Sequence, residues 1–250
     1  MRLNPKILSP IALVILWEVA VRANWLDPRL IAPPSLVAVE LWRLLRDGEL
    51  LAALGVSLIR VVAGFLIASV IGVVLGALMA RVNTVEVIFD PLIELFRPVS
   101  PLALFPLFIL WFGIGEASKI FIIAFACSFP IILNTYAGVR NIDATFFRAS
   151  RSLGASPWEL MRTVVLPGSL PHIFTGLRIG WGIALIVIIA AEMIGAVRGI
   201  GYMVLDSQQT FRIPRLFGSI VVIGLLGFLT DLGFRALRRR MLPWYRESRE

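Results

Sequence analysis

Long apolar runs, separated by short polar segments, form the main pattern of this chain. About 20 apolar residues are needed to cross the hydrocarbon core of a bilayer as a helix. Six runs are candidate spans, and they cover residues 7–21, 56–79, 101–112, 120–136, 176–197 and 216–234. The pattern therefore predicts an all-α, polytopic membrane protein with about six transmembrane helices, in a single domain that covers residues 1–250.

Two of these runs differ from an ordinary transmembrane span. The run 101–112 is short unless the helix extends in both directions. The run 7–21 follows a short basic start and has the length of the apolar part of a signal peptide, but Trp17 and Glu18 interrupt it and no small-x-small cleavage site follows. We expect residues 7–21 to stay in the protein as its first helix.

The segment 35–54, between the first two spans, has a different pattern. Val37, Leu41 and Leu44 recur there at helical spacing among polar residues. This pattern predicts an amphipathic helix that lies on the membrane surface or on the protein itself.

Composition agrees with a membrane protein. Of the 250 residues, 58% are hydrophobic and 16% are charged, and the mean hydropathy is +0.88. The net charge of +8 would suggest nucleic-acid binding in a soluble protein. Here the arginines cluster between the apolar runs, as membrane topology requires, so we expect no nucleic-acid partner.

The distribution of positive charge predicts an orientation. If the N-terminus is cytoplasmic, the inside segments carry 15 Lys and Arg residues and the outside segments carry 8. Because cytoplasmic loops are enriched in these residues, both termini are predicted to be cytoplasmic. The long polar segment 137–175 then also lies on the cytoplasmic side of the membrane.

Local signals in segment 137–175 predict two short helices joined by a turn. Asp143 is a capping residue for a first helix that ends at Leu153, and Gly154 follows where a left-handed residue would end it. A second helix starts at Ser156-Pro157-Trp158-Glu159, which has the pattern of a capping box with proline in the first turn. Leu166 and Pro167 are expected to end that helix.

A motif within this segment resembles the EAA loop of bacterial ABC-importer permeases. The family pattern is Glu-Ala-Ala, three residues, Gly, nine residues and Ile-x-Leu-Pro. The matching residues, at the same spacing, are Arg148-Ala149-Ser150, Gly154 and Val164-Val165-Leu166-Pro167. Arg148 replaces the Glu of the pattern, and Ser150 replaces its second Ala.

Further strings resemble the nitrate, sulfonate, taurine and bicarbonate branch of these permeases. They are Arg97-Pro98-Val99-Ser100-Pro101-Leu102, Leu110-Trp111-Phe112-Gly113-Ile114-Gly115, Ser118-Lys119-Ile120, Ala190-Ala191-Glu192 and Gly199-Ile200-Gly201-Tyr202. The tail Arg239-Arg240-Met241-Leu242-Pro243-Trp244 resembles taurine- and alkanesulfonate-type members. The resemblance covers roughly residues 30 to 245.

The resemblance implies a fold, a function and partners. The fold would be that of a type I importer permease, in which the cytoplasmic loop forms a coupling helix that docks on an ATPase subunit. The implied coupling residues are Arg148, Ala149, Ser150, Leu153, Gly154, Ala155, Leu166 and Pro167. The chain would form the path of a small anion such as taurine, an alkanesulfonate, nitrate or bicarbonate across the bacterial inner membrane. Its partners would be a second copy of itself, two ATPase subunits and a periplasmic binding protein.

The chain itself lacks the means to hydrolyse ATP. A P-loop needs Gly-Lys followed by Ser or Thr, and the two lysines, Lys6 and Lys119, follow Pro5 and Ser118. One Cys and one His exclude an internal disulfide framework and a Cys/His metal site. We therefore expect a transport subunit that is not an enzyme and holds no cofactor, with ATP and Mg²⁺ on the partner subunit.

Four residues are candidates for the translocation pathway. Glu192 lies within a predicted span, where a carboxylate is costly, so it serves either the pathway or a structural hydrogen bond between helices. Arg60, near the outer end of the second span, either attracts an entering anion or extends to the membrane surface. Ser100 and Asn134 complete the set.

Two other classes of membrane protein fit the sequence less well. An ion-gradient-driven secondary transporter would usually show internal repeats and several intramembrane acids, whereas the chain has no repeat and only Glu18, Glu192 and Asp231 in or near its spans. An intramembrane enzyme would need a catalytic set, for which His172 and Cys127, each the only residue of its type, provide no basis.

Overall fold

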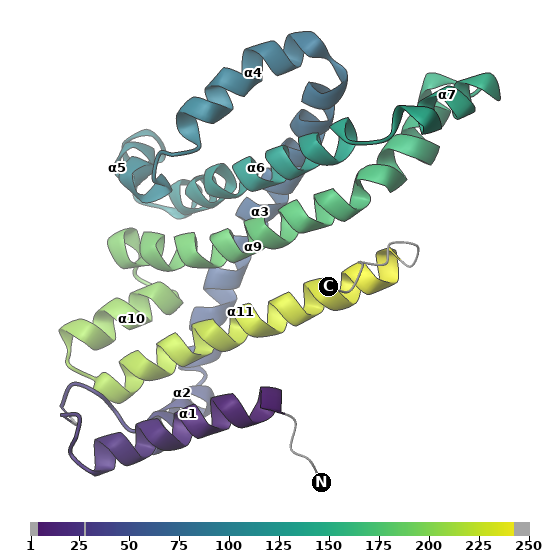
Figure 1. Ribbon diagram of the computed structural model, residues 1–250. Helices are drawn as coiled ribbons and strands as arrows, with labels where there is room; N and C mark the ends of the chain where they lie inside the picture. The colour runs from purple at the N-terminus through teal and green to yellow at the C-terminus, as the bar shows by residue number, and fades with distance from the viewer. Residues whose placement is uncertain (1–4, 28, 243–250) are drawn as a thin grey trace. The chain divides into compact units, whose positions relative to one another are not determined.

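The computed structural model describes residues 5–27 and 29–242. In these residues the chain is helical and has no strand, which confirms the predicted all-α class. The helices are α1 (Pro5–Arg22), α2 (Pro34–Arg46), α3 (Glu49–Arg81), α4 (Asn83–Phe96), α5 (Pro101–Phe112), α6 (Glu116–Arg140), α7 (Ala144–Ser152), α8 (Pro157–Leu160), the π-helical η1 (Met161–Val165), α9 (Leu166–Gly195), α10 (Ile200–Gln209) and α11 (Ile213–Met241) (Figure 1).

Four of the predicted spans are confirmed as helices long and apolar enough to cross a membrane. They are α3, α6, the helix Pro157–Gly195 that includes α9, and α11. The predicted span 101–112 is α5, whose 12 residues cover only about 18 Å. It qualifies only together with α4, to which it is bent by 104°. The described residues thus support four spans, or five with the bent pair, against about six predicted.

The predicted first span forms the helix α1. In the described part of the chain, α1 is not among the helices that are long and apolar enough to cross a membrane. It has 18 residues, and three of them, Lys6, Glu18 and Arg22, are charged. A helix of this length covers about 27 Å, slightly less than the apolar core of a bilayer.

The chain divides into two compact units, each built from two stretches of sequence. Unit 1 comprises Met1–Leu58 and Glu192–Leu226, and unit 2 comprises Ile59–Ala191 and Gly227–Glu250. As a consequence, α3, α9 and α11 each contribute one part to each unit.

In unit 1, the amphipathic segment is α2, and it packs on the protein. Its buried side chains are Val37 and Leu44. Gly218 of α11 leaves room for Leu41, because a Cβ at this glycine would lie 3.1 Å from Leu41 Cδ2. Of the two alternatives left open by the pattern, this packing supports the one in which the helix lies on the protein.

In unit 2, small residues let three long helices approach each other closely. A Cβ at Gly72 of α3 would lie 2.6 Å from Ile131 Cγ2 of α6, and one at Gly76 would lie 2.6 Å from the carbonyl oxygen of Ile132. A Cβ at Gly176 of α9 would lie 2.9 Å from Asn134 Cβ of α6, and α6 runs beside α9 in Figure 1. Close packing of this kind is typical of helices within a membrane, where the hydrophobic effect does not drive helices together.

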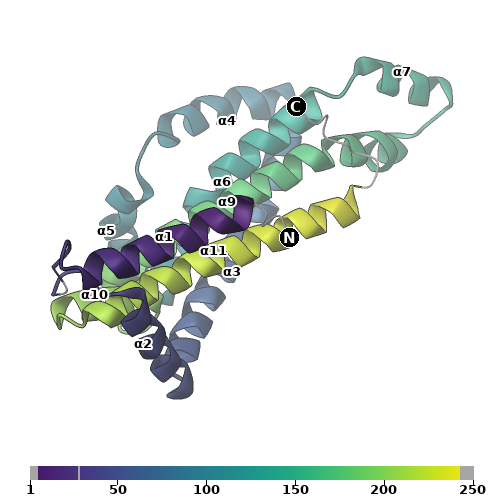
Figure 2. The same cartoon turned by 60° about the horizontal axis from the view of Figure 1, so that its bottom comes forward.

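The polar segment after α6 begins as predicted. The Asp143 carboxylate accepts a hydrogen bond of 2.8 Å from a backbone N–H in the first turn of α7. Gly154 follows α7 with a φ of 81°, in the left-handed region. Ser156 and Glu159 then form a complete capping box at the start of α8. We refer to residues 143–160 as the hairpin, and Figure 2 shows α7 projecting at one end of α6.

One prediction for this segment is wrong, because the second helix does not end at Leu166 and Pro167. It continues through η1 into α9, so that Pro157–Gly195 forms one helix of 39 residues. In η1 the N–H of Leu166 bonds to the carbonyl of Met161, five residues earlier. This wider turn accommodates Pro167, which has no N–H to donate and whose ring crowds the preceding turn of a regular helix.

Candidate functional site

The hairpin exposes large apolar side chains around its turn. Leu153 is 88% exposed, Trp158 is 73% exposed and Phe146 is 63% exposed. Leu153 and Trp158 flank Gly154, whose positive φ reverses the chain direction between α7 and α8. A cluster of exposed apolar residues outside the predicted spans is typical of a surface that contacts another protein.

The structure brings the predicted coupling residues together on this hairpin and its continuation. Arg148, Ala149 and Gly154 are exposed, as is Leu166 beyond the hairpin, whereas Ser150, Ala155 and Pro167 are half-buried. Leu153, directly before Gly154, is the most exposed apolar residue of this set.

Interactions within unit 2 hold the hairpin in place. The guanidinium carbon of Arg81, the last residue of α3, lies 4.6 Å from the centre of the Phe147 ring in α7. This is a cation–π contact. At the start of α7, the backbone N–H of Thr145 donates to Asp143 and keeps the pKa of that carboxyl below its usual value. The hairpin is therefore linked to α3 by a side-chain contact and to α9 by a continuous helix.

The predicted pathway residue Glu192 lies in a fully buried polar cluster of unit 1. Its residue exposure is 0%, and the Ser57 hydroxyl of α3 lies 2.8 and 2.9 Å from its two carboxylate oxygens. The backbone N–H of Gly201 donates to Oε2 at 2.9 Å, and the N–H of Ile200 donates to Ser57 Oγ at 2.9 Å. Glu192 and Ser57 thus cap the N-terminus of α10, where the helix dipole favours a negative charge.

Gly199 makes this arrangement possible. It precedes α10 with a φ of 127°, and a Cβ there would lie 2.4 Å from the carboxyl carbon and both oxygens of Glu192. Only glycine therefore fits between the carboxylate and the start of the helix. These contacts favour the structural interpretation of Glu192, a hydrogen bond to another helix.

Arg60 is buried and pairs with a carboxylate of this chain. Its residue exposure is 4%, and its Nε and Nη2 lie 2.5 and 2.6 Å from the two carboxylate oxygens of Glu116, the first residue of α6. This two-pronged geometry is the strong form of an arginine–carboxylate pair. The pair connects α3 to α6 within unit 2.

The other two predicted pathway residues have separate surroundings. Ser100 is exposed and takes the N-cap position of α5, without a side-chain cap bond. Asn134 is half-buried, and its amide donates to the Pro130 carbonyl of its own helix at 2.8 Å. Its Cβ is also 2.9 Å from the position that a Cβ of Gly176 would take, so Asn134 lies where α6 packs on α9.

The remaining acids near the spans also have protein partners. Glu18 accepts hydrogen bonds from the backbone N–H and the hydroxyl of Ser35 at 3.0 and 2.8 Å, and from Arg22. Asp231 accepts from Arg178 and Arg235. Together with Glu192, all three carboxylates that the sequence places in or near spans are held by groups of this chain.

Sequence reasoning missed three residues of these clusters. Ser57 and Glu116 are the partners of Glu192 and Arg60, and Gly199 separates Glu192 from α10. A weak signal was available for Ser57, because it is a polar residue in an apolar run and lies one helical turn before Arg60. Arg2, Arg246 and Arg249, which the orientation argument counts, lie outside the described residues.

Solved structures with a similar fold are chains of ABC transporters. A chain of the MetNI methionine ABC transporter in an inward-facing conformation superimposes with a TM-score of 0.67, over 78% of this chain and 97% of that one, at 19% identity. A chain from a crystal structure of an amino acid ABC transporter with histidines gives a TM-score of 0.60, over 79% of this chain and 94% of that one, at 20% identity. The fold is therefore that of an ABC transporter permease.

Relatives with established names are more similar in sequence. The chain is 40% identical to the taurine transport system permease protein TauC of Escherichia coli, over 95% of this chain and 88% of that protein. It is 34% identical to the putative aliphatic sulfonates transport permease protein SsuC of Bacillus subtilis, over 95% and 86%. It is 36% identical to the bicarbonate transport system permease protein CmpB of Synechococcus elongatus, over 74% and 67%.

The profile of the family described as binding-protein-dependent transport system inner membrane component matches residues 68–243, and the chain belongs to this family. It is the permease subunit of an ABC importer and an inner membrane component. This membership sets aside the gradient-driven transporter and the intramembrane enzyme.

Proposed function

We propose that two copies of this chain form the pathway by which a small anion crosses the inner membrane. Two separate ATPase subunits drive the process, and a periplasmic binding protein delivers the anion. Taurine, an alkanesulfonate, nitrate or bicarbonate are the candidate substrates, and the names of the relatives TauC, SsuC and CmpB support this class. ATP and Mg²⁺ belong to the ATPase subunits, and this chain needs no cofactor.

The hairpin is the observation that carries the proposal. Leu153 and Trp158 expose most of their apolar surface on either side of the Gly154 turn. In this proposal they insert into a cleft of an ATPase subunit and become its main anchors. Large side chains of this kind, tryptophan above all, dominate the binding energy of many interfaces once they are buried in a pocket.

The second arm of the hairpin provides the mechanical connection. Because Pro157–Gly195 is one helix, a displacement of Trp158 by the ATPase is transmitted directly to the membrane-spanning part of α9. The contact of Arg81 with Phe147 transmits the same displacement to α3. Closure of two ATPase subunits thus changes the arrangement of these two spans and opens the pathway on the opposite side.

Two further features complete the proposal. The described residues contain one such hairpin, and two ATPase subunits need two, so the assembly contains two copies of this chain. The hairpin meets the ATPases only if it is cytoplasmic, which agrees with the charge distribution. In this proposal both termini lie on the same side as the hairpin.

The interface is tested by replacing its anchors in the complete transporter. Trp158→Ala and Leu153→Asp should each lower co-purification of the ATPase and abolish uptake of radiolabelled taurine by proteoliposomes. Ile114→Ala is the matched control, because Ile114 is 79% exposed but lies between α5 and α6, on the predicted outer side. It should leave both measurements unchanged.

Native mass spectrometry of the wild-type complex tests the stoichiometry. Two copies of this chain with two ATPase subunits are expected. An active assembly with a single copy of this chain would contradict the proposed homodimer.

A further inference from the structure

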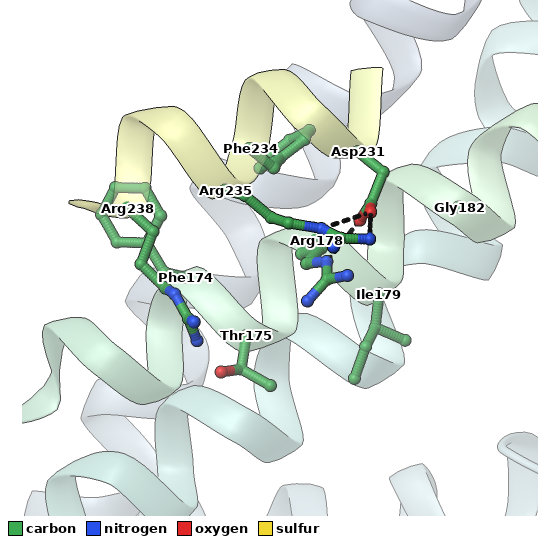
Figure 3. A pocket seen from close by; sticks show the side chains of 9 residues that line it. All are labelled: Phe174, Thr175, Arg178, Ile179, Gly182, Asp231, Phe234, Arg235 and Arg238. Carbon is green, nitrogen blue, oxygen red and sulfur yellow. Dashed lines mark hydrogen bonds and ion pairs between the residues drawn. The ribbon is translucent and has the colours of Figure 1, made fainter. Parts of the chain in front are cut away.

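A pocket of about 470 Å³ lies in unit 2, between α9 and the last part of α11 (Figure 3). Its charged lining residues are three arginines, Arg178, Arg235 and Arg238, and one acid, Asp231. Aromatic side chains of both helices, Phe174 and Phe234, form part of its apolar wall. The pocket therefore combines a strongly basic side with an apolar one.

Asp231 holds two of the arginines at once. Arg178 Nε lies 2.5 Å from its Oδ1, and Arg235 Nε lies 2.8 Å from its Oδ2. Figure 3 shows the two guanidinium groups meeting at this carboxylate. One negative charge faces two positive charges, so these three residues together carry a net positive charge.

The arginines keep donors for a second anion. A guanidinium has five N–H groups, and Arg178 donates to Asp231 through Nε alone. Its side chain is 42% exposed and that of Arg235 is 50% exposed, so both remain accessible from the pocket. Asp231 fixes the direction of both side chains, and this lowers the entropy that an incoming anion would otherwise have to remove.

The ends of the predicted spans put the pocket near the membrane–water boundary. Arg178 is near the beginning of the predicted span 176–197, and Asp231 and Arg235 are at the end of the span 216–234. Lipid phosphates occupy this depth, and basic pockets between membrane helices on the cytoplasmic side bind anionic headgroups. A positive group that is only partly neutralised is costly next to hydrocarbon, and an anion would offset that cost.

We propose that this pocket binds a tetrahedral oxyanion through Arg178 and Arg235. The oxyanion is the phosphate of an anionic phospholipid or a free sulfonate, because the arginine fork matches the oxygen atoms of both groups. Phe174 and Phe234 then contact the carbon atoms attached to the oxyanion. The sulfonate source rests on the proposed transport function, whereas the phospholipid source needs only a membrane.

The proposal is tested by binding to the full-length protein in detergent. The delipidated protein is titrated with phosphatidylglycerol in one arm and with methanesulfonate in another. Phosphatidylcholine, whose zwitterionic headgroup has no net charge, serves as the control. Bound lipid is counted by native mass spectrometry, and methanesulfonate binding is measured by calorimetry. Arg178→Gln should weaken the binding of the oxyanion about fivefold.

A matched variant separates the pocket from general positive charge. Arg239→Gln removes the same charge from the same end of α11, but Arg239 is exposed and does not line the pocket. It should leave the affinity unchanged. If Arg178→Gln fails to fold, Arg235→Gln replaces it, because Arg235 is half-exposed and shares Asp231 with Arg178.

Each outcome decides the proposal. Binding of phosphatidylglycerol that depends on Arg178 or Arg235 identifies a lipid site, and binding of methanesulfonate with the same dependence identifies a site for a free oxyanion. Equal binding by the wild type, Arg178→Gln and Arg239→Gln, or no binding of either probe, overturns it. Because neither arm measures uptake, a failure of the proposed transport function would not be mistaken for a failure of this site.

Discussion

The cluster around Glu192 and the hairpin around Gly154 differ in the environment of their side chains. In the cluster, the Ser57 hydroxyl and the Gly201 N–H donate to a carboxylate whose exposure is 0%. In the hairpin, Leu153 and Trp158 expose 88% and 73% of their surface. The cluster finds its partners inside the chain, whereas the hairpin leaves a large apolar surface exposed.

This difference indicates a structural role for Glu192 and a binding role for the hairpin. A glutamate within a span is the feature of the sequence that most suggests a transport pathway, yet its contacts are those of a helix cap. Substitutions in the cluster should therefore lower the stability of the chain, and substitutions in the hairpin should lower its association with the ATPase. Four predictions test this division.

The largest effect is expected for Gly199→Ala. The new Cβ would lie 2.4 Å from the Glu192 carboxylate, and the φ of 127° is strained for any side chain. The free energy of unfolding should fall by about 3 kcal/mol or more. Reversible unfolding in mixed micelles, followed by circular dichroism, measures this loss. Gly224→Ala is the control, since nothing lies within 4 Å of its Cβ position, and stability should not fall.

Replacement of Glu192 itself should have the next largest effect. Glu192→Ala leaves the Gly201 N–H and the Ser57 hydroxyl without their acceptor, at a cost of about 2 kcal/mol in unfolding free energy. Glu192→Gln keeps an acceptor oxygen and should cost less. If Glu192→Gln abolished uptake while the free energy of unfolding stayed at the wild-type value, the charge of Glu192 would serve the pathway. The structural role of the cluster would then be contradicted.

Gly154→Val should weaken the association of the chain with the ATPase. The φ of 81° at Gly154 costs a β-branched residue about 1–2 kcal/mol locally, but nothing lies within 4 Å of the Cβ position. We expect the variant to insert and dimerise normally, to bind the ATPase poorly and to lose transport. Gly154→Asn should retain function, because asparagine tolerates the left-handed region. Normal ATPase binding by Gly154→Val would show that the hairpin is not the coupling element.

The smallest effect is expected for Arg81→Gln, which removes the cation–π contact with Phe147. Such contacts contribute about 0.5–1 kcal/mol at exposed sites, which corresponds to about a twofold to fivefold change in an equilibrium. Substrate-stimulated ATPase activity should fall by a similar factor, with ATPase binding retained. Arg81→Lys, which keeps the charge, should recover part of the activity.

Local features of the sequence were sufficient to predict the hairpin. The N-cap Asp143, the left-handed Gly154 and the capping box of Ser156 and Glu159 each depend on residues no more than a few positions apart. Backbone geometry at this range follows from short-range sterics and hydrogen bonds, so the sequence determined it. The apolar runs likewise determined the four long spans, because the thickness of a bilayer requires their length.

Only the tertiary structure decided which partners the buried polar groups have. Ser57 and Glu192 are 135 positions apart, and Arg60 and Glu116 are 56 positions apart, so no local pattern connects them. It also decided that the helix continues past Pro167 through a π turn and that α5 is too short to span on its own. The physical reason is the same in each case. A buried donor, acceptor or proline is stabilised by whatever the packed chain places beside it, and that arrangement arises only when distant segments meet.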